Sequence, residues 1–140
     1  MNIYFAGSIR AGREDVGLYG QLIKKLKQYG PVLTEHVGDP KITIEGEGYD
    51  AEGDKKVWIK DMAFMKQAEA LVAEITIASL GVGYEIAKAE EKGIPILCLF
   101  RPGSGKKVSG LIRGCPNATT IEYETIAEAE KIIEKFFKTI

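Results

Sequence analysis

The 140-residue sequence has few histidines and cysteines, the residues that commonly bind zinc or form disulfides. It contains one histidine, His36, and two cysteines, and neither cysteine has the spacing of zinc ligands. Cys98 stands in the apolar run "IPILCLF" and is expected in the core, whereas Cys115 stands in a turn-like "RGCPN". We therefore expect no metal site, and a reducing, cytoplasmic setting fits best.

Long apolar runs and an excess of one charge are also missing. No run approaches the roughly 18 apolar residues of a membrane span. The first residues, "NIYFAG", lack the basic segment and the long apolar stretch of a signal peptide. Acidic and basic residues nearly balance, at a net charge of −1, and are mixed along the chain. We therefore expect neither a membrane nor a nucleic acid as a partner.

What is present is an ordinary globular composition, with 45% apolar and 28% charged residues, and a length that suits one domain over 1–140. Strand-like segments alternate with segments of helical periodicity. The expected strands are 2–7, 31–36, 69–77, 94–100 and 118–123. The expected helices are 14–29, 55–68, 82–92, 108–113 and 125–140. Residues 37–54 lack periodicity and are expected as a long loop, which in compact domains is usually functional or mobile.

This alternation predicts an α/β fold, a single-domain open parallel sheet of about five strands with helices on both faces. The number of strands suits a flavodoxin-like, doubly wound sheet with the strand order 2-1-3-4-5. In such sheets ligands bind beyond the carboxyl ends of the strands, where the strand order reverses. The segments with the most unusual chemistry all follow expected strands, so we expect them at one edge; they are 7–10, 34–36, 76–85 and 101–109.

The first of these segments, "GSIRAGRED" at 7–15, places small residues and two arginines ahead of a helix. Free backbone N–H groups and the helix dipole suit an anion there. Ser8 can donate a hydrogen bond, and Arg10 can make a bidentate contact to a phosphate. The motif is neither a Walker A sequence nor GxGxxG, so a capped helix start with solvated arginines is the alternative.

The second segment, "SLGVGYE" at 79–85, repeats this logic. Ser79 and the backbone of Gly81 can hold another side of the same phosphate, because glycine allows close approach. Glu85 is expected in the first helical turn, where the helix dipole would keep it ionised as a nucleophile. The alternative is an ordinary acidic residue, which is favourable in a first turn anyway.

Three further residues are candidates. Asp61 lies among apolar residues in "WIKDMAFM", and an aspartate on the buried side of a helix needs a partner or a task; a surface position is the alternative. His36 ends an expected strand at the ligand edge, where it would contact substrate or serve the structure. Ser109 lies in "RPGSGKKVSG", which resembles a phosphate loop only loosely and otherwise reads as a solvated basic loop.

Together these motifs resemble one family. "YFAGSIRAGRED", "VLTEHV", the aspartate at 61, "SLGVGYE" and "ILCLFRPGSGKKVSGLIRG" occur in this order. They are similar to the 2′-deoxynucleoside 5′-monophosphate N-hydrolases, which belong with the nucleoside 2-deoxyribosyltransferases. Each motif alone is weak, but the joint match is specific and extends from Asn2 to about Gly114.

The resemblance implies an enzyme that cleaves the N-glycosidic bond of a small-molecule substrate, a deoxynucleoside 5′-monophosphate, without a cofactor. Glu85 would be the nucleophile that forms a covalent deoxyribosyl-enzyme, which water then releases with retained configuration. Asp61 would assist near the sugar and the departing base. Tyr4 matches a tyrosine whose hydroxyl contacts the nucleophile.

The resemblance also implies a phosphate cradle and an assembly. The residues that match the cradle are Ser8, Ile9, Arg10, Ser79 and Gly81. Ser109 matches a serine that reaches the phosphate from a neighbouring subunit, so a homodimer is implied. His36 falls where the family has a histidine on the base side. Residues 37–54 depart from the family pattern, and this leaves the preferred base open.

Three other functions stay open on the sequence. A deoxyribosyltransferase would share Glu85 but pass the sugar to a second base and prefer unphosphorylated nucleosides. A ribonucleotide hydrolase would differ in its selectivity at the 2′ position. A non-catalytic nucleotide-binding module would need neither Glu85 nor Asp61.

Overall fold

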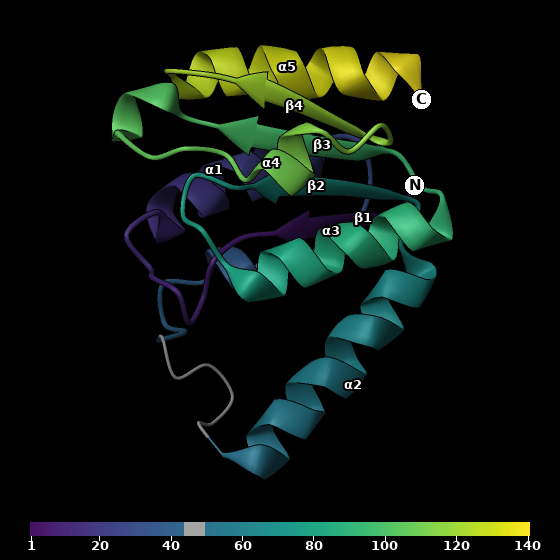
Figure 1. Cartoon of the computed structure of the whole chain (residues 1–140). Coiled ribbons are helices and arrows are strands. Elements are labelled where there is room, and N and C mark those ends of the chain that lie inside the picture. The colour runs from purple at the N-terminus through teal and green to yellow at the C-terminus, as the bar shows by residue number, and fades with distance from the viewer. Residues whose placement is uncertain (44–49) are drawn as a thin grey trace.

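The computed structural model describes residues 1–43 and 50–140, and its centre is a parallel sheet (Figure 1). The four strands lie side by side in chain order: β1 (Ile3–Ala6), β2 (Ala70–Glu74), β3 (Ile96–Phe100) and β4 (Ala118–Glu122). Every residue of β1, β2 and β3 is buried. This burial explains why those strands are apolar almost throughout, since helices cover both faces of a parallel sheet.

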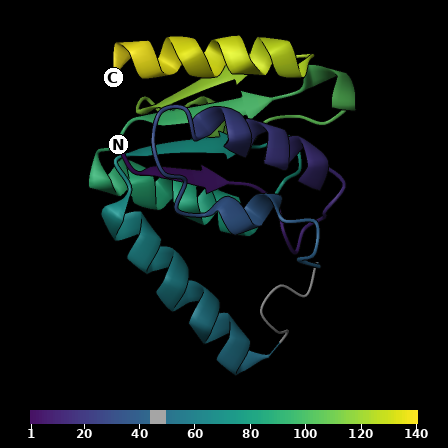
Figure 2. The ribbon, with the colours of Figure 1, turned by 180° about the vertical axis from the view of Figure 1, so that it is seen from behind.

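Helices form a layer on each face of the sheet, as Figures 1 and 2 show from opposite sides. The helices are α1 (Val16–Leu26), η1 (Glu35–Gly38), α2 (Ala51–Gln67), α3 (Leu80–Lys92), η2 (Pro102–Ser104), α4 (Gly110–Arg113) and α5 (Ile126–Thr139). One hydrophobic cluster joins α1 and α5 to one face, and a second joins α3 and the end of α2 to the other. The predicted α/β architecture is therefore confirmed.

The predicted strand at 31–36 is wrong. Val32 makes only an isolated parallel bridge to Ile3. Next to Phe5, the side chain of Thr34 takes the place of backbone pairing between strands. The Thr34 hydroxyl donates to the Phe5 carbonyl at 2.7 Å and accepts from the Phe5 N–H at 2.9 Å. The chain then turns into η1. The bridge at Val32 lies beside β1, at the edge of the sheet away from β2. If 31–36 is counted as the second expected segment, the order of the five segments is therefore still 2-1-3-4-5, although only four of them are strands.

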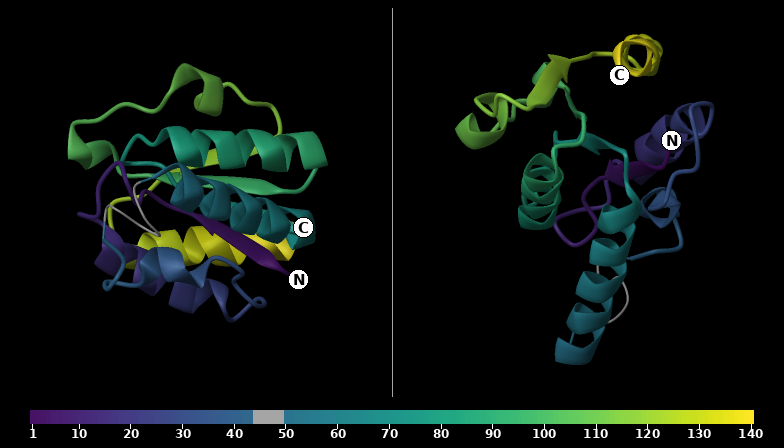
Figure 3. Two further views of the ribbon diagram at one scale, coloured as in Figure 1. Left: turned by 90° about the horizontal axis from the view of Figure 1, so that it is seen from below. Right: turned by 90° about the vertical axis from the view of Figure 1, so that its right-hand side faces the viewer.

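The helix α2 projects from the sheet (Figures 1 and 3). It begins four residues earlier than expected, because the carboxylate of Asp50 caps it by accepting from the Gly53 N–H at 2.7 Å. The expected loop 37–54 is therefore shortened at both ends by η1 and α2, and 44–49 lie outside the described residues. None of the helices in the described part of the chain is long and apolar enough to cross a membrane.

Candidate active site

A cavity of about 290 Å³ lies between α2 and α3. The two helices meet at their C-terminal ends, where the ammonium of Lys92 donates to the carbonyls of Met65 and Lys66, and they diverge toward their N-terminal ends (Figure 1). The described residues that line this α2–α3 cavity are Arg10, Asp54, Val57, Trp58, Asp61, Met62, Gly81, Tyr84 and Glu85. Four predicted site residues from three separate segments therefore share one cavity: Arg10, Asp61, Gly81 and Glu85.

Glu85 is held by a hydrogen bond from the buried Tyr4 of β1. The Tyr4 hydroxyl donates to Oε1 of Glu85 at 2.6 Å, across 81 positions of sequence. Val82, Ile86 and Ala89 form the buried stripe of α3. Glu85 lies at the edge of that stripe, because residues three apart share a helix face. The stripe therefore aims the carboxylate toward the sheet and into the cavity.

The expected position of Glu85 in the first turn is wrong. The helix α3 begins at Leu80, since the hydroxyl of Ser79 caps it by accepting from the Val82 N–H at 3.4 Å. Glu85 is therefore the sixth helical residue and lies in the second turn, beyond the reach of the helix dipole, which falls off within the first turn.

The environment of Glu85 favours its protonated form. Burial raises the pKa of Glu85 to about 8, the negative charge of Asp61 adds to this, and the hydrogen bond from Tyr4 opposes it. Burial and the same two carboxylates raise the pKa of Tyr4 far above its usual range. Tyr4 is therefore a permanent donor to Glu85, and burial acts on the ionisation of Glu85 in the direction opposite to the one expected from a helix dipole.

Asp61 is the second carboxylate of the cavity, and the surface position considered as an alternative is wrong. It follows Val57 by one helical turn and precedes Met65 by one, so it lies on the face of α2 that packs inward. Its Oδ1 is buried without a hydrogen-bond partner among the described residues. Burial raises the pKa of Asp61, and the neighbouring Lys60 lowers it in part. A buried, unpartnered carboxylate oxygen is costly, which is typical of a functional group.

The segment after β1 carries a second unpartnered polar atom. Ser8 is fully buried, and its backbone N–H donates to the Tyr19 hydroxyl at 3.2 Å. Its Oγ, however, is buried without a partner among the described residues. The Ile9 side chain is partly buried and packs against the hydrophobic cluster on the α1 face.

The two arginines of this segment make different contacts. Arg10 lines the α2–α3 cavity and forms an ion pair with Asp54 of α2 at 2.5 Å. Arg13 donates to the carbonyls of Val37 and Asp39, both at 2.8 Å, and so ties the segment to η1. The alternative of a solvated arginine is therefore wrong for Arg13, and Arg10 is the arginine that a ligand in the cavity can meet.

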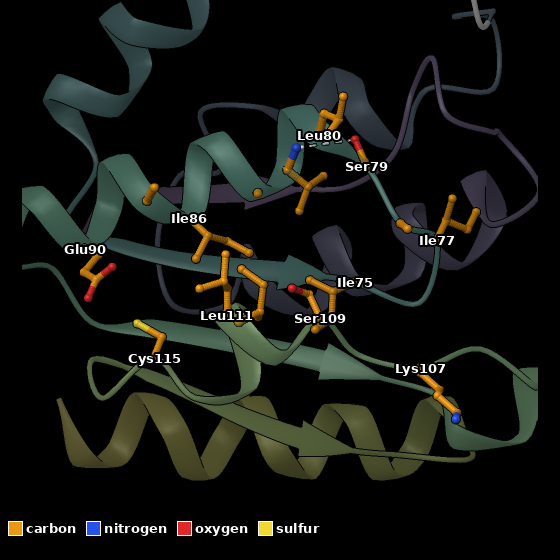
Figure 4. A pocket seen from close by; sticks show the side chains of 15 residues that line it. Ile75, Ile77, Ser79, Leu80, Ile86, Glu90, Lys107, Ser109, Leu111 and Cys115 are labelled. Atoms are coloured by element: carbon orange, nitrogen blue, oxygen red, sulfur yellow. Dashed lines mark hydrogen bonds between the residues drawn. The ribbon is translucent and has the colours of Figure 1, made fainter.

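Ser109 does not line the α2–α3 cavity of its own chain. It lines a second cavity of about 640 Å³ between α3 and α4, together with Ser79 (Figure 4). The walls of this α3–α4 cavity are largely apolar, and two of its leucines are almost fully exposed, Leu80 at 97% and Leu111 at 87%. Within one chain the structure therefore separates Ser109 from Glu85.

His36 lies in η1 rather than at the end of a strand. Its ring faces Phe64 of α2, with the ring centroids 6.4 Å apart. Burial lowers the pKa of His36 to about 4, and the positive charges of Lys60 and Arg13 add to this. His36 is therefore neutral near pH 7, and it lies beside α2 without being one of the described lining residues of the cavity.

Sequence reasoning missed the aromatic wall of the cavity. Neither Trp58 nor Tyr84 was named as a candidate site residue from the sequence, yet Trp58 is 57% exposed and lines the cavity with Tyr84. The available signal was the spacing of Trp58 three positions before Asp61, which places both on one helix face. Among residues 1–43 and 50–140, no group of three or more histidine, cysteine or acidic side chains is arranged to hold a metal ion.

Comparison with known proteins decides the family. The family model described as nucleoside 2-deoxyribosyltransferase matches residues 3–113. The chain belongs to this family. A relative from Danio rerio, named 5-hydroxymethyl-dUMP N-hydrolase, is 46% identical over 142 residues, which cover 100% of this chain and 98% of the relative.

More distant similarities agree with this membership. A relative of the same name from Homo sapiens is 42% identical over 139 residues, which cover 97% of this chain and 79% of the relative. Among solved structures, the CMP N-glycosidase BcmB from Clostridium botulinum superposes with a TM-score of 0.65 over 96% of this chain and 99% of that one. It is only 16% identical to this chain, so it supports the fold alone.

The pKa of Glu85 predicts how the stability of this family member depends on pH. The folded state raises this pKa from 4.5 to about 8, so the folded state binds the proton more tightly and loses stability as pH rises between these values. Glu85→Gln removes the charge. Even after discounting for solvent screening of a half-buried group, we expect Tm at pH 8.5 to rise by about 4 °C, or roughly 1 kcal/mol.

The control for this prediction is Glu91→Gln, on the exposed face of the same helix. Its carboxylate pairs with Lys88 at 2.6 Å, which lowers the pKa of Glu91, so the substitution should give no gain at high pH. Differential scanning calorimetry at pH 5 and pH 8.5 measures both variants. Equal Tm changes for Glu85→Gln at the two pH values would contradict the burial of this charge.

Proposed function

We propose that this chain hydrolyses the N-glycosidic bond of 2′-deoxynucleoside 5′-monophosphates to a free base and 2-deoxyribose 5-phosphate. The observation that carries the proposal is the pair of half-buried carboxylates, Glu85 and Asp61, in one cavity, with Tyr4 donating to the first. Glycoside-cleaving enzymes use two carboxyl groups in this way, one as nucleophile and one as acid and base. The names of the similar relatives support the same substrate class.

The phosphate end of the substrate fits the segment after β1 and the start of α3. The buried, unpartnered Oγ of Ser8 offers a hydrogen bond, and Arg10 offers a cation at the cavity wall. The backbone of Ile9 and Gly81 would complete the proposed cradle together with the cap residue Ser79, which precedes Gly81 by two positions and lines the α3–α4 cavity. Phosphate binding at this remote point positions the anomeric carbon over Glu85, so that binding energy is used to orient the reacting atoms.

The proposed first step forms the deoxyribosyl-enzyme. The ionised carboxylate of Glu85 attacks the anomeric carbon while the bond from that carbon to the base nitrogen breaks. The base leaves with that electron pair and takes a proton from Asp61, whose raised pKa favours the protonated acid. The hydrogen bond from Tyr4 keeps the nucleophilic oxygen in place, and the carboxylate stabilises the positive charge that develops on the sugar.

The second step returns the enzyme to its starting state. Water attacks the anomeric carbon and gives its proton to Asp61, and the bond to Glu85 breaks with its electron pair on the carboxylate. Both carboxyl groups then regain their original protonation, and the product is 2-deoxyribose 5-phosphate with retained configuration. Because Glu85 acts when ionised, kcat/KM should rise with pH toward about 8.

We propose a homodimer as the assembly. Leu80 and Leu111 expose nearly all of their apolar surface beside the α3–α4 cavity, and such surfaces mark contact sites. Ser109 lies there too, outside the α2–α3 cavity of its own chain. A second copy seated on this surface would bury the leucines and bring its own Ser109 toward the neighbouring phosphate end.

We also propose a cytoplasmic setting. Cys98 and Cys115 are both free thiols, and burial raises the pKa of Cys98 to about 12, so that it stays an unreactive thiol. Unpaired cysteines suit a reducing compartment.

The homodimer is tested with Leu111→Asp. A charge on this exposed position should convert the protein to a monomer in light scattering after size-exclusion chromatography, and should lower activity with monophosphates at least about tenfold if Ser109 acts across the interface. Ile140→Asp, an exposed apolar position at the end of α5, is the matched control and should leave the mass unchanged. A wild-type protein that runs as a monomer would contradict the assembly.

The reaction is tested by chromatography of released base. We expect base from dGMP, dAMP, dCMP or dTMP, and little from GMP or deoxyguanosine. Glu85→Ala should lower this activity at least about 1000-fold, as loss of a nucleophile does, while calorimetry shows that nucleotides still bind.

Each alternative has its own outcome in this assay. A new nucleoside that appears only with an added free base would identify a deoxyribosyltransferase. Release from GMP at an equal rate would identify a ribonucleotide hydrolase, and tight binding without any release would identify a binding module. Full activity of Glu85→Ala would contradict the role of Glu85.

A further inference from the structure

Two aromatic side chains form part of the wall of the α2–α3 cavity. Trp58 of α2 and Tyr84 of α3 are 57% and 45% exposed, and both line the cavity. The indole N–H of Trp58 donates to the Tyr84 hydroxyl at 3.4 Å. This contact joins the two helices, and both rings line the cavity that also contains Asp61 and Glu85.

The exposure of these two rings has to be explained, because neither ring is buried in the hydrophobic core. An exposed tryptophan forgoes the large stabilisation that burial of its ring gives. Trp58 precedes Asp61 by three positions and Met62 by four, so all three share one helix face. Tyr84 lines the same cavity as Trp58, Asp61 and Glu85. Under the proposed reaction the anomeric carbon and its base would occupy this cavity, within which the two rings lie.

We propose that Trp58 is the surface on which the departing nucleobase stacks, and that its hydrogen bond to Tyr84 sets the orientation of the indole. The inference rests on the proposed function. The cavity wall here consists of Val57, Trp58, Met62 and Tyr84, which offer aromatic and aliphatic surface and a single hydroxyl. Such a wall recognises a base by its planar face, because every base has a π-face and stacking tolerates changes at the base edge.

This assignment divides the recognition of substrate between two ends of the cavity. The phosphate meets Ser8 and Arg10, whereas the base meets Trp58. Loss of Trp58 should therefore weaken binding of all four deoxynucleoside monophosphates by a similar factor. It should leave 2-deoxyribose 5-phosphate, which has the same sugar and phosphate but no base, unaffected.

The chain provides its own probe for this contact, because Trp58 is its only tryptophan. The experiment uses the Glu85→Ala protein, so that no substrate turns over. Indole fluorescence is followed while dGMP, dAMP, dCMP, dTMP or 2-deoxyribose 5-phosphate is added, and calorimetry measures each Kd. We expect the nucleotides to change the fluorescence and 2-deoxyribose 5-phosphate to leave it nearly constant.

Variants then test the stacking. In the same Glu85→Ala protein, Trp58→Ala should raise the Kd of each deoxynucleotide roughly 5- to 150-fold, the range that base–aromatic stacking gives. Trp58→Phe keeps a ring and should recover most of this loss. The matched control is Ile59→Ala, which removes a neighbouring side chain that is 52% exposed and outside the described cavity wall. This control should leave the Kd of every ligand unchanged.

The outcomes separate this inference from the proposed function. Nucleotide binding that is unchanged by Trp58→Ala would overturn the stacking role alone. An equal loss of affinity for 2-deoxyribose 5-phosphate would also overturn it, because the effect would then not depend on the base. Absence of binding by every deoxynucleotide would overturn both proposals. A loss that is confined to the nucleotides and recovered by Trp58→Phe supports the inference.

Discussion

The hydrogen bond from Tyr4 to Glu85 is the contact on which the candidate site depends. It joins the first strand to α3 at 2.6 Å, and it forms only because β1 and β2 pair in register and α3 packs back on them. The same packing brings Arg10 and Gly81 to one cavity. The parallel sheet thus serves the site by fixing the relative position of segments that are far apart in the sequence.

Among the described residues, the carboxylates that are wholly or partly buried include two kinds. Glu74 is fully buried at the end of β2, but its oxygens accept from the Thr76 N–H at 3.2 Å and the Tyr123 hydroxyl at 3.0 Å. Such a group is satisfied, and its task is structural. Asp61, in contrast, keeps a buried oxygen without a partner among the described residues. Burial raises the pKa of Glu85 strongly. Whether the oxygens of a carboxylate are satisfied therefore distinguishes structural from functional carboxylates better than burial alone.

Periodicity and turn residues were enough to predict the α/β fold, the layers and most helices, because each element buries a continuous apolar stripe. They failed at 31–36, where a side-chain hydroxyl of Thr34 takes the place of backbone pairing. They also placed Glu85 one turn too early, because the choice of Ser79 as helix cap depends on local geometry. At 31–36 and at the start of α3, one or two hydrogen bonds decide between the expected and the observed structure. Local composition does not encode those hydrogen bonds.

The candidate site divides in the same way. Residues from separate motifs could be placed at one edge of the sheet, since parallel strands end together. The exposed side of the cavity could not be predicted, because Trp58 and Tyr84 meet only through the angle between α2 and α3. The separation of Ser109 from Glu85 within one chain was likewise implied only by the family resemblance, since the sequence alone does not give the distance between two loops at one edge of a sheet.

The central claim is that Glu85 forms a covalent bond to the anomeric carbon. The most direct test is the stereochemistry of transfer to methanol, whose glycoside product keeps its anomeric configuration in solution. The protein would be incubated with a deoxynucleoside monophosphate in water containing methanol, and the methyl glycoside of 2-deoxyribose 5-phosphate examined by proton NMR. Two displacements at Glu85 predict the β-anomer, with the configuration of the substrate retained. The α-anomer would show a single displacement and would contradict the account.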